Sequence, residues 1–269
     1  MRWLTAIAVL CLVGCTTTTT TVLSPSGATS NETRGPIVPD ANEDSEERRR
    51  ARIRTELAAS YFQQRNMSVA LDELRQAIAA DATFAPAFGL LGLIYMDLRE
   101  NSKAEESFQR ALKLTPNDSE LNNNYGWFLC QTDRTKDSFG FFNRATRNPL
   151  YATPAKPLHN AGICALRVGD EVLAESYLKQ SFQADSRNPV AMFQLSEFYL
   201  KRNDLRQASL YSRRLLSMYD PNAEALWLAL RVERQVGDRS AEARFSSQLR
   251  RRYPDSRETA MLLSGQYER

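Results

Sequence analysis

The sequence predicts an all-α fold, a right-handed superhelix of six helical hairpins followed by a C-terminal capping helix. The first observation is a set of large and small apolar residues that recurs about every 34 residues between residues 51 and 256. The second is that large residues within each unit lie three, four and seven positions apart, which places them on one helix face. Such a pattern predicts a single array of stacked repeats.

The clearest unit begins at Ala85, and its pattern resembles the tetratricopeptide repeat, with Phe88 in the place of the usual Trp. Its pattern residues are Phe88, Leu91, Gly92, Tyr95, Ala104, Phe108, Ala111 and Pro116. The large residues of the first helix pack against the second, and the small residues let the helices approach closely. Pro116 ends the second helix, because proline cannot continue the helical hydrogen bonds. The resemblance implies a superhelix of helix pairs.

Six such units account for most of the chain. They are expected near residues 51–84, 85–118, 119–152, 155–188, 189–222 and 223–256, followed by a cap at 257–269. The step between the third and fourth units is longer, because two residues are inserted in the proline-containing turn 148–154. The sixth unit is degenerate, since Glu242 stands where a small residue is expected. The cap is expected because the last repeat would otherwise expose its apolar face.

Residues 1–14 have the composition of a signal peptide. Arg2 precedes an apolar run, Trp3–Val13, of about eleven residues, whereas about 20 are needed to span a bilayer. The run ends in Leu12-Val13-Gly14-Cys15, which resembles the lipobox of bacterial lipoproteins. That resemblance implies cleavage before Cys15 and acyl chains on its side chain and new amino terminus. An ordinary signal peptide that contains a Cys is the alternative.

Residues 15–44 are expected to form a lipidated N-terminus and a disordered tether ahead of a folded domain at 45–269. The segment holds six consecutive threonines and many turn-forming residues, without a helical or strand period. About 28 flexible residues have an r.m.s. span of roughly 30 Å. Thr16 follows the modified Cys, where an Asp would signal inner-membrane retention in lipoproteins. The expected location is therefore the periplasmic face of the outer membrane.

The tetratricopeptide resemblance implies that certain positions of the first helices face a concave groove. The candidate groove residues are Phe62, Leu93, Met96, Asn123, Trp127 and Gln131. Large apolar side chains at positions expected to be exposed indicate a site for an extended or helical segment of another protein. The alternative is that the curvature of the superhelix or neighbouring side chains bury them.

Two further cysteines, Cys130 and Cys164, fall near the ends of neighbouring first helices. The periplasm is oxidising, so a disulfide that joins the third and fourth units is expected. The alternative is a pair of small buried thiols, because a disulfide requires the two Cα atoms to lie within about 7 Å.

The composition argues against catalysis, metal binding and nucleic-acid binding. His159 is the only histidine, and there is no Ser/His/Asp order, phosphate-binding glycine loop or His/Cys metal spacing. The 35 basic and 32 acidic residues give a net charge of only +3. The basic run Arg48–Arg50 follows a run of acids, which favours a self-paired helix start. We therefore expect a monomeric non-enzyme whose only attached groups are the acyl chains on Cys15.

Three segments are more specific than the repeat pattern. Asn124–Cys130 (NYGWFLC), the turn Asn148–Tyr151 and Asn160–Ala165 resemble the PilF/PilW family of type IV pilus biogenesis lipoproteins. The resemblance implies an outer-membrane pilotin, which binds subunits of the pilus secretin and promotes their localisation and assembly into multimers. The alternative is another tetratricopeptide envelope lipoprotein that scaffolds outer-membrane protein insertion or cell-wall enzymes.

Overall fold

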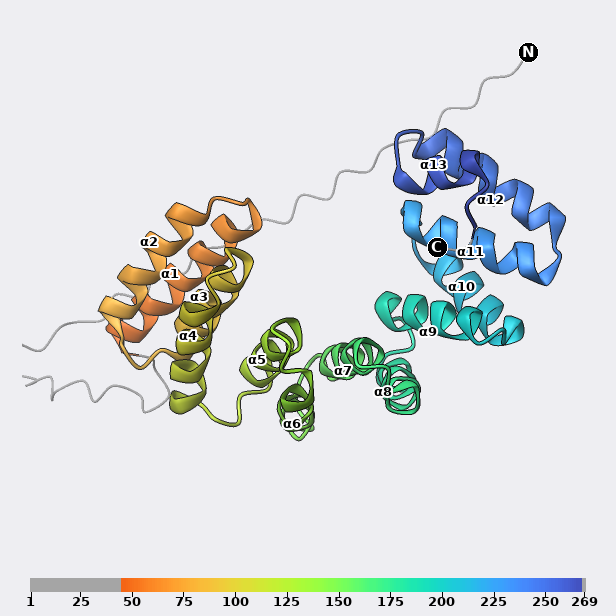
Figure 1. The fold of residues 1–269 in the computed structure, drawn as a ribbon. Helices are drawn as coiled ribbons and strands as arrows, with labels where there is room; N and C mark the ends of the chain where they lie inside the picture. Colours follow the sequence, from red (N-terminus) through yellow and green to blue (C-terminus); the bar gives the residue numbers. More distant parts are fainter. Residues whose placement is uncertain (1–44, 268–269) are drawn as a thin grey trace, which may run out of the picture. The chain divides into compact units, whose positions relative to one another are not determined.

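The computed structural model describes residues 45–267, and this part of the chain contains thirteen α-helices and no strand (Figure 1). The expected signal peptide, residues 1–14, and tether, residues 15–44, lie outside the described residues. The helices are α1 (Glu46–Gln63), α2 (Met67–Ala80), α3 (Ala85–Asp97), α4 (Asn101–Leu114), α5 (Ser119–Gln131), α6 (Thr135–Ala145), α7 (Ala155–Arg167), α8 (Glu171–Ala184), α9 (Pro189–Lys201), α10 (Leu205–Met218), α11 (Ala223–Val236), α12 (Arg239–Arg252) and α13 (Arg257–Ser264).

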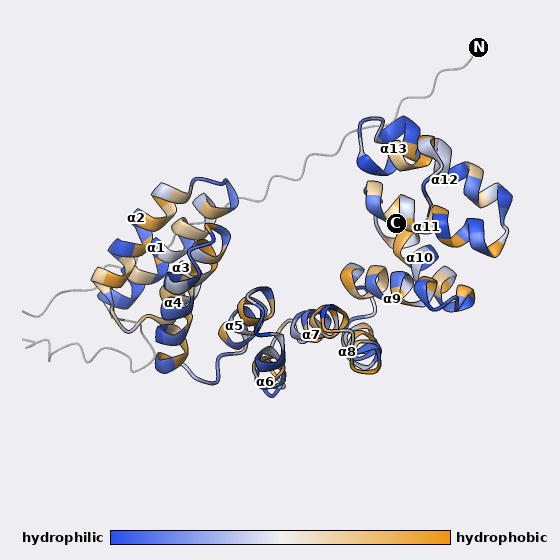
Figure 2. Ribbon diagram, viewed as in Figure 1, coloured by the Kyte–Doolittle hydropathy of each residue, from blue (hydrophilic) through white to orange (hydrophobic). Residues whose placement is uncertain are grey.

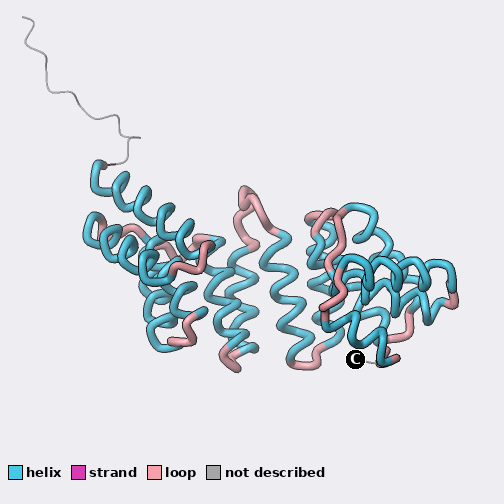
Figure 3. Tube along the Cα trace, turned by 90° about the horizontal axis from the view of Figure 1, so that it is seen from above, coloured by secondary structure: helices cyan, strands magenta, loops and turns pink. Residues whose placement is uncertain are grey.

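The helices pair in chain order into six hairpins. Each odd-numbered helix up to α11 packs against the even-numbered helix that follows it, and it also contacts the next odd-numbered helix. Figure 3 shows the hairpins following one another, joined by short loops. The first helices of the repeats therefore form one continuous inner row. The all-α architecture of six hairpins and a C-terminal helix, predicted from the sequence, is confirmed.

Local side chains determine where the helices begin. The Asp118 carboxylate accepts a hydrogen bond from the backbone N–H of Leu121 at 2.8 Å, which caps α5. Asx side chains cap α8, α9, α10, α11 and α12 in the same way. Ser45 caps α1, so this helix begins at Glu46, five residues ahead of the first expected unit.

The turn inside every hairpin has the same backbone conformation. One residue with a positive φ lies two residues before the second helix, at the fifteenth position of each unit. These residues are Arg65, Arg99, Asp133, Gly169, Asn203 and Gly237. A left-handed residue ends a helix and lets the chain reverse. Glycine supplies this conformation without strain at only two of the six turns.

Small residues at the eighth position of the first five units allow the two helices of a hairpin to touch. A Cβ added to Gly92 would lie 2.7 Å from the ring of Phe108, and one added to Gly162 would lie 2.6 Å from Leu178. Both of these large side chains are fully buried. Most helices carry both hydrophobic and hydrophilic residues (Figure 2), whereas α3 is apolar along most of its length.

The sixth unit, which the sequence pattern marks as degenerate, forms a complete hairpin. Its buried residues on α12 are Ala241, Phe245 and Leu249, so the small buried residue stands one position earlier than expected. The side chain of Glu242 is only 13% exposed and forms ion pairs with Arg234 and Arg239. The capping helix α13 then covers this hairpin with side chains such as Met261 and Leu262.

The glycine positions generate a prediction with an internal control. Gly92→Ala places a methyl group against the ring of Phe108, so it should lower the free energy of unfolding by about 1–3 kcal/mol. Gly140→Ala, in α6, meets no atom within 4 Å. It should instead raise that free energy by about 0.5–1 kcal/mol, because alanine is the better helix former. Urea unfolding followed by circular dichroism measures both, and equal shifts would contradict the packing explanation.

Candidate protein-binding groove

Two adjoining clefts run along the inner row of first helices. The first, called here the N-terminal cleft, has a volume of about 320 Å³ and is lined by Thr55, Glu56, Ala59, Pro86, Gly89, Leu90, Leu93, Asp118, Glu120, Leu121 and Asn124. The second, called the aromatic cleft, has a volume of about 370 Å³ and is lined by Phe62, Leu93, Met96, Asp97, Glu120, Asn123, Asn124, Trp127, Lys156 and Asn160. Leu93, Glu120 and Asn124 belong to both, so the two clefts form one groove.

The structure brings five of the six candidate groove residues together in the aromatic cleft. They are Phe62 from α1, Leu93 and Met96 from α3, and Asn123 and Trp127 from α5. The sixth, Gln131, is not part of it, and its placement in the groove is corrected. Gln131 is the last residue of α5, and its side-chain oxygen accepts a hydrogen bond from Arg167 at 2.9 Å. That contact holds it at the end of the helix.

The apolar walls of the aromatic cleft are half-buried. Leu93 and Met96 pack against the core cluster of Phe108 and Phe128, and Phe62 packs against the core of the first hairpin. Neighbouring side chains thus cover part of each apolar residue, as the alternative interpretation anticipated, and leave the rest facing the cleft. A preformed apolar cleft of this kind can receive a large side chain of a partner.

A row of side-chain amides forms the floor. Asn160 on α7 donates a hydrogen bond to the side-chain oxygen of Asn123 at 2.9 Å, and Asn123 donates to Asn124 at 3.2 Å. Asn123 is only 1% exposed, so it lies beneath the cleft with almost no free surface. A buried amide requires hydrogen-bond partners, and the neighbouring helix α7 supplies one of them. These amides keep a polar floor between apolar walls.

Glu120 is the charged centre of the groove. It accepts hydrogen bonds from Lys156 of α7 and from the hydroxyl of Tyr151, the latter at 2.6 Å. Burial raises the pKa of the Glu120 carboxyl, but these hydrogen bonds outweigh burial, so its pKa lies below the ordinary value and it stays ionised. Burial and the contact with Glu120 raise the pKa of Tyr151. Tyr151 lies in the lengthened turn after α6, which therefore reaches back to the groove.

A disulfide joins the groove helices α5 and α7 directly. Cys130 and Cys164 are bonded, with their Cα atoms 5.9 Å apart, and both side chains are fully buried. Trp127 of the aromatic cleft packs against this cluster. Arg167 donates a hydrogen bond to the backbone oxygen of Cys130 at 2.7 Å. The covalent bond therefore fixes the third repeat to the fourth beneath the groove.

The single histidine and the first arginine of the basic run 48–50 have hydrogen-bond or ion-pair partners within the fold. His159 is half-buried, and Asn188 donates a hydrogen bond to its Nδ1 at 2.9 Å. Burial and the charge of Lys156 lower the pKa of His159 to about 4, so the imidazole is neutral at neutral pH. In the basic run, Arg48 forms an ion pair with Asp81 at 3.1 Å.

The part of the chain that the structure describes, residues 45–267, lacks both a metal-binding cluster and a membrane-spanning helix. No group of three or more His, Cys, Asp and Glu side chains in it could hold a metal ion. No helix in the same residues has the length and apolar character needed to cross a membrane.

Comparison with known proteins agrees with this architecture. A model of the tetratricopeptide repeat family matches residues 85–118. The crystal structure of PilW, described as a widely conserved type IV pilus biogenesis factor, matches with a TM-score of 0.72 and 32% identity, over 79% of this chain and 98% of that one. The protein belongs to the PilF/PilW family. The tetratricopeptide superhelix predicted from the sequence is therefore confirmed, and the chain is a tetratricopeptide protein of type IV pilus biogenesis.

Two further matches extend over most of the chain. The type IV pilus assembly protein PilF of Pseudomonas aeruginosa is 26% identical over 87% of this chain and 91% of its own length. A solved structure from a functional characterization of Pseudomonas aeruginosa PilF has a TM-score of 0.72 at 23% identity, over 82% of this chain and all of that one, which shows the shared fold. Within this PilF/PilW protein, the segment Asn124–Cys130 supplies the α5 side of the groove.

The disulfide generates a stability prediction. Replacing both Cys130 and Cys164 with Ala should lower the free energy of unfolding by about 3–4 kcal/mol, because the bond closes a 34-residue separation in the unfolded chain. Urea unfolding under oxidising conditions measures the change. Reductant should destabilise the unmodified protein and have no effect on the double variant. Equal unfolding midpoints for the two proteins without reductant would contradict the prediction.

Proposed function

We propose that this protein is an outer-membrane pilotin that binds secretin subunits of the type IV pilus. In this role it promotes their localisation to the outer membrane and their assembly into multimers. The observation that carries the proposal is the groove, in which apolar side chains from three successive repeats converge over a polar floor. Membership of a family of type IV pilus biogenesis proteins supports the choice of partner.

The groove has the features of a site for a protein segment. Phe62, Met96 and Trp127 present large, half-buried surfaces that can anchor apolar side chains of a partner. Among the amides of the floor, Asn160 is half-buried and can hydrogen-bond to a peptide backbone, whereas Asn123 is buried. The disulfide and the contacts of Glu120 hold the groove helices α5 and α7 in place. These helices therefore need little further ordering when a partner binds.

The N-terminal part of the chain would supply the membrane address. Cys15 carries the acyl chains in this proposal, and several chains are required for stable anchoring. Residues 15–44 would then let a monomeric repeat domain reach a secretin subunit from the periplasmic face of the outer membrane. The role requires binding and no chemical reaction. The alternative is a scaffold for outer-membrane protein insertion or cell-wall enzymes. The two roles differ in whether loss of the anchor affects secretin multimers or the envelope in general.

The groove assignment is tested with a double substitution. Leu93→Ala combined with Trp127→Ala should weaken capture of purified secretin subunits by about 30-fold or more, since even a single groove anchor of this kind contributes about 2 kcal/mol. The matched control is Leu150→Ala with Val172→Ala, which removes two apolar side chains that are 88% and 80% exposed outside the groove. Surface plasmon resonance measures the affinity, and circular dichroism establishes that both variants fold. Equal affinity of the two double variants would refute the assignment.

The membrane address is tested with Cys15→Ala. This variant should leave the repeat domain folded but reduce secretin multimers in the outer membrane, because unanchored protein cannot bring the subunits there. Membrane fractionation and electrophoresis of the detergent-resistant multimers measure the effect. Normal multimers in the outer membrane would contradict the pilotin mechanism. General outer-membrane protein or cell-wall defects with unaffected secretin would instead favour the scaffold alternative.

A further inference from the structure

The N-terminal cleft combines an apolar body with a purely acidic set of charges. Its charged lining consists of Glu56 on α1, Asp118 at the start of α5 and Glu120 on α5, and no Lys or Arg is among its lining residues. Pro86, Leu90 and Leu93 form apolar walls beside these carboxylates. The aromatic cleft next to it holds the only lysine of the groove lining, Lys156, which is paired with Glu120.

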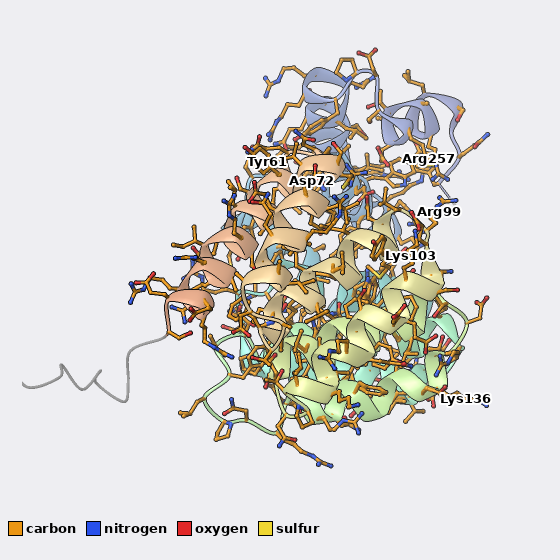
Figure 4. All side chains as sticks on the ribbon, turned by 90° about the vertical axis from the view of Figure 1, so that its left-hand side faces the viewer. Tyr61, Asp72, Arg99, Lys103, Lys136 and Arg257 are labelled. Carbon is orange, nitrogen blue, oxygen red and sulfur yellow. A yellow bond between two sulfur atoms is a disulfide. The ribbon has the colours of Figure 1, made fainter. Side chains whose placement is uncertain are left out.

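The carboxylates differ in how far they are neutralised. Asp118 caps α5 through a backbone hydrogen bond, which leaves its negative charge in place. Glu56 is exposed, and within residues 45–267 it forms no ion pair. Lys103 on α4 and Lys136 on α6, both labelled in Figure 4, are not among the residues that line the N-terminal cleft. The lining of the N-terminal cleft is therefore acidic, and Glu120 is the only one of its three carboxylates that pairs with a lysine in the described residues.

We propose that the groove binds a partner segment that places a Lys or Arg side chain in the N-terminal cleft and a large apolar side chain in the aromatic cleft. The alkyl stem of the basic residue packs on Leu90 and Leu93, and its cation meets Glu56 and Asp118. The inference rests on the proposed function, in which this groove binds another protein, and it adds the chemical class of the bound segment.

Physical arguments favour this occupant over others. Lys and Arg bury their methylene stems on apolar surface while the charged ends remain near polar groups. A purely apolar side chain would desolvate the carboxylates without a partner for them, which is costly. An acidic segment would be repelled by like charge. Side chains on one face of an extended segment repeat about every 7 Å, so neighbouring ones can enter adjoining clefts that share Leu93.

The test uses peptides and does not depend on the identity of the partner. Displayed random peptides of about 12 residues, long enough at roughly 3.3 Å per residue to span both clefts, are selected on the purified full-length protein. Selected sequences should be enriched in Lys or Arg close to a large apolar residue. Their affinity, measured by fluorescence anisotropy, should fall as salt rises from about 0.01 M to about 1 M, where the Debye length shrinks from roughly 30 Å to about 3 Å.

Charge variants then locate the contact. Glu56→Lys should weaken binding of the selected peptides by about fivefold or more, because it replaces an attraction with a repulsion. Glu56→Gln should have a smaller effect in the same direction. The matched control is Glu106→Lys, which makes the same charge change on the exposed surface of α4 and should leave the affinity unchanged.

Each unfavourable outcome overturns the inference. These outcomes are selected peptides without basic residues, equal binding to the Glu56→Lys and Glu106→Lys variants, and no enrichment over a surface without protein. The proposed function is judged separately by secretin capture. Capture that depends on Trp127, without any preference for basic peptides, would leave the pilotin role intact and refute the charge assignment. If the protein selects basic peptides but does not capture secretin, the charge assignment is supported and the pilotin role is refuted.

Discussion

The structure depends on one constraint, which is that no hairpin can bury its apolar surface alone. Each first helix packs on its own second helix and on the first helix of the next repeat. The close approach within a hairpin requires small residues such as Gly92, which lies under the ring of Phe108, and Gly162, which lies under Leu178. Because each first helix also contacts the next first helix, these helices line up in one row. The groove is the part of that row which packing between repeats leaves uncovered.

Contacts between distant segments make this part of the row rigid. The bond between Cys130 and Cys164, and the hydrogen bond from Asn160 to Asn123, both join α5 to α7. Tyr151, in the turn lengthened by two residues, adds a third connection through Glu120. A surface held in this way presents its apolar side chains without first being ordered, which reduces the entropic cost of binding a partner.

Polarity divides the groove into two chemically different parts. The aromatic cleft has large apolar walls and charges of both signs, whereas the N-terminal cleft has smaller apolar walls and only carboxylates as charged lining residues. A protein of type IV pilus biogenesis that works by binding can obtain affinity from the first part and selectivity from the second. The other ion pairs of the described residues, such as Arg48 with Asp81, connect neighbouring helices and support the fold.

The sequence by itself determined the six hairpins and the cap, because a regular period places equivalent residues on equivalent helix faces. The resemblance of its repeats to the tetratricopeptide family indicated five residues of the aromatic cleft. Only the tertiary structure decided the burial of Asn123, the capture of Gln131 by Arg167 and the acidic character of the N-terminal cleft. It also decided that the sixth hairpin buries Ala241 in place of residue 242. The physical reason is that the period specifies which way a side chain points, whereas its burial and partners come from neighbouring repeats more than thirty residues away in the chain.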